Sequence, residues 1–180
     1  MIRSTVPKSA YVEAVEQHYE RIYALLYRLA RDTVLAEDLT QDTFAKAWRS
    51  MDRFEGRSSL GTWLYKIALN TYRDHLRRNR VPIDSLEDED SLSSPDPAPG
   101  LIESLAAEQL QLRVQQAVDR LPEIYREVVI LRCYQGLKYR EVAELLEVPI
   151  GTVQHRIHVA FEKLRAALGE EVVDCETVNV

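Results

Sequence analysis

The stretch YREVAELLEVPIGTVQHRIHVAFEKL, residues 139–164, decides the fold of the C-terminal third of the chain. Its first part is short and amphipathic, and residues 148–151 (VPIG) interrupt it, because proline lacks an amide donor. Apolar residues then return on one helical face: Val153, Ile157, Ala160 and Leu164. A short helix, a tight break and a longer one-faced helix are typical of a DNA-reading helix-turn-helix. A plain helical hairpin is the alternative.

The outward face of the longer helix carries few cations. It presents Thr152, Gln154, His155, His158, Val159, Glu162, Lys163 and Arg165. Glutamine can read adenine, and histidine can donate to a phosphate or to a guanine edge. Val159 and Glu162 add no attraction for DNA, so the sequence preference of this helix is left open.

The rest of the chain also favours helix, which predicts an all-α fold of two small helical domains. Glycine and proline are nearly absent between residues 8 and 55, and no strand alternation is evident. Pro122 suits the first turn of a helix, with Ile124, Val128 and Leu131 as its buried stripe. We expect helices near 8–31, 34–53, 60–79, 103–120, 123–134, 139–147 and 152–168.

Charge divides the chain into blocks. The net charge of −6 is made of +4 over residues 1–80, −8 over 81–112, +2 over 113–168 and −4 over 169–180. Prolines, serines and acids fill residues 81–102, which we expect to be extended and poorly ordered. A bland spacer is an equal alternative to a functional linker. The predicted units are therefore 1–80, an acidic linker 81–104, a helix-turn-helix unit 105–168 and an acidic tail 169–180.

Bulk properties exclude several classes of protein. A hydrophobic content of 46% allows a packed core, and no apolar run approaches the roughly 20 residues that span a bilayer. Nothing at the N-terminus predicts export. Cys133 and Cys175 are too few and too isolated for a disulfide scaffold. These features favour a reducing cytoplasm.

A basic stripe is predicted on the helix over 60–79. Its buried side would hold Leu60, Leu64, Ile67 and Thr71. The opposite side would hold Lys66, Asn70, Arg73, Arg77 and Arg80, with Trp63 and Tyr72 beside them. Cations in line with aromatics suit a nucleic-acid backbone and its bases. A solvated polar face is the alternative.

The helix over 34–53 predicts a protein-docking edge. Its buried stripe would be Thr40, Phe44, Ala47, Trp48 and Met51. The other side shows Leu35 and Leu39 among Asp38, Asp42, Lys46 and Arg49. Exposed leucines rimmed by carboxylates suggest a partner surface. With equal weight, another helix of the same domain could cover the leucines.

Three groups of motifs resemble the extracytoplasmic-function (ECF, group 4) class of bacterial sigma factors. The first is AEDLTQDTF (36–44) followed by AW (47–48), and the second is FEGRSS (54–59) leading into TWLYKIALN (62–70). The third comprises LP (121–122), VILR (129–132), GL (136–137), YREVA (139–143) and PIGTV (149–153). The resemblance covers about 15–80 and 105–168.

The resemblance implies partners and site residues. The partners would be core RNA polymerase, through its β′ clamp helices and β flap, promoter DNA, and an anti-sigma factor; no cofactor, metal or catalytic residue is expected. Core polymerase would contact Leu35, Asp38, Leu39, Gln41, Asp42 and Phe44. The −10 element would contact Phe54, Arg57, Ser58, Ser59, Trp63, Lys66, Asn70, Arg73, Arg77 and Arg80. The −35 element would contact Lys138, Tyr139, Thr152, Gln154, His155, Arg156, His158 and Lys163.

Two other classes of function compete with this interpretation. A stand-alone helix-turn-helix regulator would need a ligand or receiver domain, and residues 1–80 show no such pattern. An enzyme would need a nucleophile constellation or a phosphate loop, and neither is visible. A metal site of His155, His158 and Cys133 is conceivable, but a DNA-facing histidine pair is the stronger hypothesis.

Overall fold

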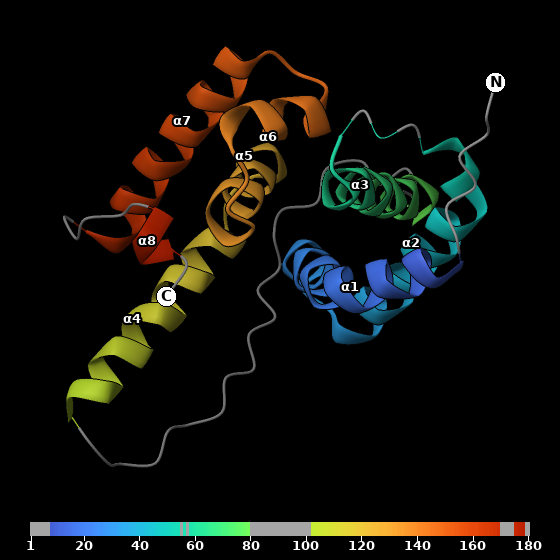
Figure 1. Cartoon of the computed structure of the whole chain (residues 1–180). Coiled ribbons are helices and arrows are strands. Elements are labelled where there is room, and N and C mark those ends of the chain that lie inside the picture. The colour runs from blue at the N-terminus through green and yellow to red at the C-terminus, as the bar shows by residue number, and fades with distance from the viewer. Residues whose placement is uncertain (1–7, 55, 57, 80–101, 170–174, 179–180) are drawn as a thin grey trace.

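The computed structural model describes residues 8–54, 56, 58–79, 102–169 and 175–178, and these are all helices and short turns (Figure 1). The elements are α1 (Lys8–Ala30), α2 (Thr33–Ser50), the 3-10 turn η1 (Met51–Arg53), α3 (Leu60–Asn79), α4 (Ile102–Asp119), α5 (Glu123–Val129), the π-helix η2 (Ile130–Tyr134), α6 (Tyr139–Leu146), α7 (Ile150–Leu168) and α8 (Cys175–Val178). The predicted all-α class is confirmed. The predicted extended linker over 81–102 lies almost wholly outside the described residues.

The N-terminal group is α1, α2 and α3, packed around leucines. Leu25, Leu26 and Leu64 are almost wholly buried. The turn between α1 and α2 is sharp: Arg31 has a φ of +57°, and the Asp32 carboxylate accepts the Leu35 amide at 2.9 Å. That side-chain bond satisfies one of the free amides at the start of α2. A short turn therefore sets α2 directly against α1.

The C-terminal group is α4 to α8, with the helix-turn-helix of α6 and α7 at its centre. The inward face of α7 is buried as its spacing predicts: Val153, Ile157, Ala160 and Leu164. Between the two helices, Glu147 has a φ of +56° and ends α6, and Pro149 precedes the first residue of α7. Proline before the first turn costs no hydrogen bond there. The predicted short helix, break and longer helix are confirmed.

Two burial predictions are wrong, because Trp48 is 44% and Ile124 48% exposed. Leu39, for which the sequence leaves both exposure and burial open, is only 4% exposed. Because α2 packs against both α1 and α3, a wide arc of it is buried, and that arc includes Leu39. Trp48 lies near the end of the helix, on its open side. Ile124 lies in the first turn of α5, away from the core.

The cysteines also differ from expectation. Cys133 of η2 and Cys175 of α8 form a disulfide, although 42 residues separate them in sequence. Sequence alone treats them as isolated, because only tertiary packing places α8 beside η2. Bonded Cys133 is thereby excluded from the metal site with His155 and His158.

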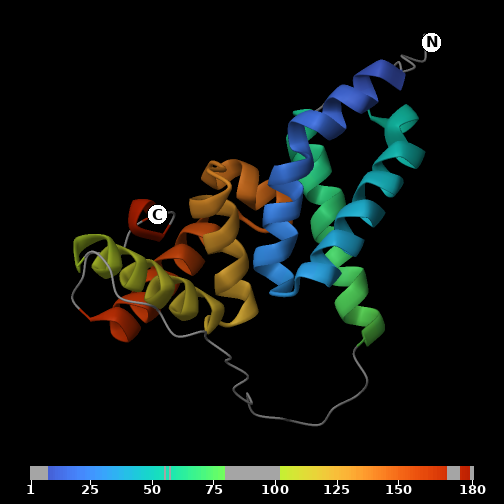
Figure 2. The same ribbon diagram turned by 90° about the horizontal axis from the view of Figure 1, so that it is seen from below.

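The two groups of helices touch each other. α1 contacts η2, and α3 contacts α6 (Figures 1 and 2). Within the described part of the chain, no helix is long and apolar enough to cross a membrane.

Candidate nucleic-acid interface

The outward face of α7 is accessible and mostly uncharged. Gln154, His155 and His158 are exposed, and His158 Nε2 lies 3.4 Å from Glu162 Oε1. Lys163 Nζ lies 5.8 Å from the centre of the Tyr125 ring. The face can therefore offer hydrogen bonds to base edges and little long-range attraction for phosphate.

The N-terminus of α6 adds a second part of this surface. The Lys138 amide donates to Glu141 Oε2 at 2.7 Å, which caps the helix. The Tyr139 ring lies 5.1 Å from the Arg132 guanidinium. Lys138 is exposed and Tyr139 half-buried, so both lie at the edge of the helix-turn-helix.

The basic stripe of α3 is present, but its cations are paired. Lys66 Nζ lies 2.9 Å from Glu147 Oε1, and Arg73 Nη2 lies 2.7 Å from Glu127 Oε1. Both acids belong to the C-terminal group of helices. Arg77 Nη2 instead contacts Asp74 of its own helix at 3.0 Å. Asn70 is exposed, and Arg80 lies outside the described residues.

The two acids that face the stripe differ in their surroundings. Burial raises the pKa of the Glu127 carboxyl, and the Arg73 guanidinium opposes that rise. The hydrogen bond and charge of Lys66 lower the pKa of Glu147. Glu127 is thus a half-buried carboxyl whose charge Arg73 stabilises, whereas Glu147 is an exposed partner for Lys66.

More contacts join the two groups of helices. Tyr65 Oη donates to Gln135 Oε1 at 2.9 Å, and Arg31 Nη1 donates to the Asp119 carbonyl at 3.0 Å. The Arg28 guanidinium lies 4.3 Å from the centre of the Tyr134 ring. We call the conformation that has these contacts, together with the ion pairs of Lys66 and Arg73, the closed arrangement. In the closed arrangement, acidic side chains of the C-terminal helices form ion pairs with cations that would otherwise bind the phosphates of a nucleic acid.

The segment before α3 brings an aromatic pair together. The Phe54 and Trp63 rings lie 5.1 Å apart, both half-buried. Ser59 Oγ accepts the Thr62 amide at 3.1 Å, and Ser58 and Ser59 are exposed. Arg57 lies outside the described residues. Tyr72, expected beside the stripe, is buried instead, and its hydroxyl donates to the Leu29 carbonyl at 3.0 Å.

The candidate docking edge of α2 is redefined by burial. Leu39 and Phe44 belong to the core, and Phe44 stacks on Tyr19 with 5.8 Å between ring centres. The alternative, that a neighbouring helix covers Leu39, is therefore correct. Leu35 is half-buried, and one face of α2 remains open: Val34, Asp38, Gln41, Asp42, Ala45 and Trp48.

Sequence reasoning missed Val34 and the two acids Glu127 and Glu147. Val34 is 70% exposed and lies one turn before Asp38. Its spacing from Asp38 and Gln41 was a usable signal, since all three share one helical face. No pattern along the chain links Glu127 or Glu147 to α3, because the partners are far apart in sequence.

Neutralising Glu127 is expected to strengthen DNA binding by the isolated chain. In Glu127→Gln the Arg73 guanidinium loses its charged partner, so DNA no longer competes with a carboxylate for this cation. A partly exposed pair contributes up to about 1 kcal/mol, which corresponds to about fivefold tighter binding. Fluorescence anisotropy with a short single-stranded DNA measures this. Glu144→Gln, on the exposed side of α6, is the matched control, and equal affinities for both variants would contradict the competition.

Comparisons with known proteins match the N-terminal and C-terminal groups of helices in the same order along the chain. Family models described as Sigma-70 region 2 and Sigma-70, region 4 match residues 14–81 and 111–164. The chain is 36% identical to the RNA polymerase sigma-H factor of Pseudomonas aeruginosa, covering 89% of this chain and 87% of that protein. It is 33% identical to the ECF RNA polymerase sigma factor SigW of Bacillus subtilis, covering 89% and 90%.

A solved structure has a similar fold. The sigma factor RpoE in complex with the anti-sigma factor NepR from Bartonella quintana matches with a TM-score of 0.70 and 26% identity, over 91% of this chain and 99% of that chain. The similarity spans both groups of helices.

Proposed function

Because the chain belongs to the ECF sigma factors of bacterial RNA polymerase, we propose that it binds core polymerase, directs it to −10 and −35 promoter elements, melts the −10 region and initiates transcription of a specific regulon. The observation that carries the proposal is the pair of candidate DNA surfaces, the α3 stripe and the α7 face, in one chain. We assign the chain to group 4 of the sigma factors, and its site of action to the cytoplasm.

We divide the chain into the units 1–80, 81–104, 105–168 and 169–180, and assign roles in transcription initiation to the first three. The first binds the β′ clamp helices and the −10 element, and the third binds the β flap and the −35 element. The acidic linker passes through the polymerase cleft, where its charge mimics nucleic acid. An anti-sigma factor holds the chain until a signal releases it.

Melting of the −10 region is assigned to α3 and the segment before it. The stripe holds the DNA backbone, and the segment 54–62, which ends beside Trp63, receives an extruded base. Flipping a base costs a few kcal/mol, and stacking on an aromatic ring returns about 1–3 kcal/mol. Binding energy alone therefore suffices for opening, without hydrolysis of a nucleotide.

Polymerase binding is assigned to the open face of α2. Val34 supplies an exposed apolar centre, and Asp38, Gln41 and Asp42 supply polar contacts around it. An apolar centre with a polar rim is the usual composition of a protein interface. Leu35 contributes at the border of this face, whereas Leu39 and Phe44 support it from the core.

The experiment that tests polymerase binding is capture of core RNA polymerase by the immobilised full chain. Val34→Asp is expected to weaken capture at least tenfold, because it places a charge at the centre of the interface. Val12→Asp is the matched control, since Val12 is 54% exposed on α1, outside the α2 face. Equal capture by the two variants removes α2 as the docking surface. Failure of the unmodified chain to capture core polymerase refutes the proposed function.

A further inference from the structure

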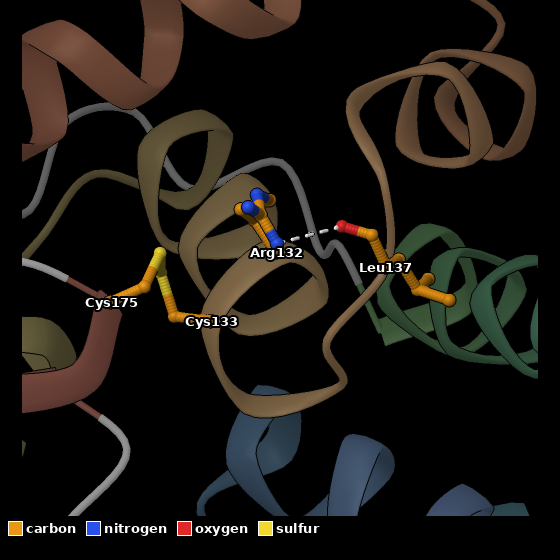
Figure 3. The surroundings of a disulfide bond; sticks show 4 residues. All are labelled: Arg132, Cys133, Leu137 and Cys175. Carbon is orange, nitrogen blue, oxygen red and sulfur yellow. Dashed lines mark hydrogen bonds between the residues drawn. A yellow bond between two sulfur atoms is a disulfide. The ribbon is translucent and has the colours of Figure 1, made fainter.

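The only two cysteines of the chain join its last helix to the helix-turn-helix unit. Cys133 is 5% exposed on η2, and its Cα lies 4.7 Å from that of Cys175, the first residue of α8 (Figure 3). Val178, at the other end of α8, is 2% exposed. The disulfide and this apolar side chain therefore fasten α8 to the C-terminal group.

The same short segment carries contacts to the N-terminal group. Tyr134 and Gln135 directly follow Cys133. Tyr134 lies under the Arg28 guanidinium of α1, and Gln135 accepts the Tyr65 hydroxyl of α3. Figure 3 shows α8 on one side of η2, with α1 and α3 on other sides. Residue 133 is thus bonded to the tail while its two successors hold the closed arrangement.

The geometry of η2 makes these two sets of contacts interdependent. In a π-helix each backbone hydrogen bond spans five residues, one more than in an α-helix, as in the bond from the Gln135 amide to the Ile130 carbonyl. Such turns are rare and occur often at functional sites. If η2 relaxed to α-helical winding, the residues after Cys133 would rotate about the helix axis. Tyr134 and Gln135 would then leave Arg28 and Tyr65. A covalent restraint on Cys133 limits that change.

We propose that Cys133 and Cys175 form a reversible, oxidation-dependent disulfide that favours the closed arrangement, and that reduction releases both the tail and the contacts of η2. Where cytosolic disulfides occur they are mostly catalytic or redox-sensing. The oxidised chain withholds Lys66 and Arg73 from DNA, whereas the reduced chain exposes them.

The chemistry balances with a low-molecular-weight disulfide as oxidant. Half-buried Cys175 is the more accessible sulfur, and its thiolate attacks the small disulfide and expels one thiolate. Cys133 then attacks the Cys175 sulfur of this mixed disulfide and expels the second. Two electrons and two protons pass from the cysteines to the oxidant, which becomes two thiols.

Thermodynamic linkage gives a test on the full chain without polymerase. The chain is equilibrated in buffers of reduced and oxidised glutathione, and free thiols are counted by mass spectrometry after alkylation. Tyr65→Phe removes the hydroxyl that Gln135 accepts, and thereby weakens the closed arrangement. Coupling between two sites is reciprocal, so this variant must make the disulfide easier to reduce. The expected shift of the midpoint is about threefold to tenfold, as for one hydrogen bond.

Tyr19→Phe is the matched control, because Tyr19 is exposed on α1 and its ring stacks on Phe44 of α2. Arg28→Gln is the second variant and is expected to shift the midpoint in the same direction. Circular dichroism confirms that each variant is folded. The proposal is overturned if the wild-type chain forms no disulfide in oxidised glutathione, or if neither folded variant shifts the midpoint relative to Tyr19→Phe.

A second measurement follows the closed arrangement directly. Small-angle X-ray scattering compares the oxidised chain with Cys175→Ser, which changes a half-buried residue of the last helix. A larger radius of gyration for Cys175→Ser is expected, because fewer molecules are closed. Equal radii, together with an unshifted glutathione midpoint, refute the coupling.

Discussion

The variant Leu39→Asp is expected to unfold the N-terminal group of helices. Leu39 is 4% exposed on α2, which packs against α1 and α3, so the substitution both removes a buried leucine and places a charge there. Removing a buried leucine costs about 2–5 kcal/mol, and an unpaired buried carboxylate adds to that cost. We expect a loss of about 4 kcal/mol or more, which is a large share of the stability of a small domain.

Chemical denaturation followed by circular dichroism measures this loss. Val34→Asp is the control, because it adds the same side chain at a position that is 70% exposed. Its free energy of unfolding should stay within about 0.5 kcal/mol of wild type. If Leu39→Asp were as stable as Val34→Asp, α2 would have to lie with Leu39 outward.

Reversing the charge of Arg77 is expected to be the most damaging single change to DNA binding. Arg77 lies within about 20° of Lys66 around α3, so it extends the basic stripe. Its side chain is 80% exposed and contacts Asp74 of the same helix, so the closed arrangement does not depend on it. Arg77→Glu removes one phosphate contact and adds repulsion. The affinity of holoenzyme for promoter DNA should fall on the order of tenfold at physiological salt.

The neighbouring residue provides the control for this variant. Arg78 is exposed on the same helix, but it lies about 120° away from Lys66. Arg78→Glu makes the same change in net charge and should have a much smaller effect. Titrations at several salt concentrations should show a shallower dependence for Arg77→Glu alone. Equal losses for both variants would mean that α3 attracts DNA only through its overall charge.

The fold was predictable because its signals are local. The spacing of Val153, Ile157, Ala160 and Leu164 predicts one buried face of α7, and the break at Pro149 predicts where this helix begins. The burial of Leu39 and the exposure of Trp48 were not predictable in the same way. Periodicity shows that a helix has faces, but the number of neighbours that cover it depends on tertiary packing.

The candidate site was predictable in part for the same reason. Lys66, Arg73 and Arg77 follow from the winding of a single helix, and the structure does bring them to one side of α3. Their acidic partners Glu127 and Glu147 lie on other helices, so no spacing rule connects them. The Cys133–Cys175 bond is equally non-local, since it depends on the packing of α8 against η2.

Two turns hold non-glycine residues in a left-handed backbone conformation, at a cost of roughly 1 kcal/mol each. These are Arg31 and Glu147, with φ of +57° and +56°. Glycine would relieve both turns, yet each residue uses its side chain to reach the other group of helices, one at the Asp119 carbonyl and one at Lys66. Replacing either residue by glycine would therefore relieve the strain of its turn and remove one contact between the two groups of helices. The strain in these two turns is thus retained together with the side-chain contacts that join the two groups of helices.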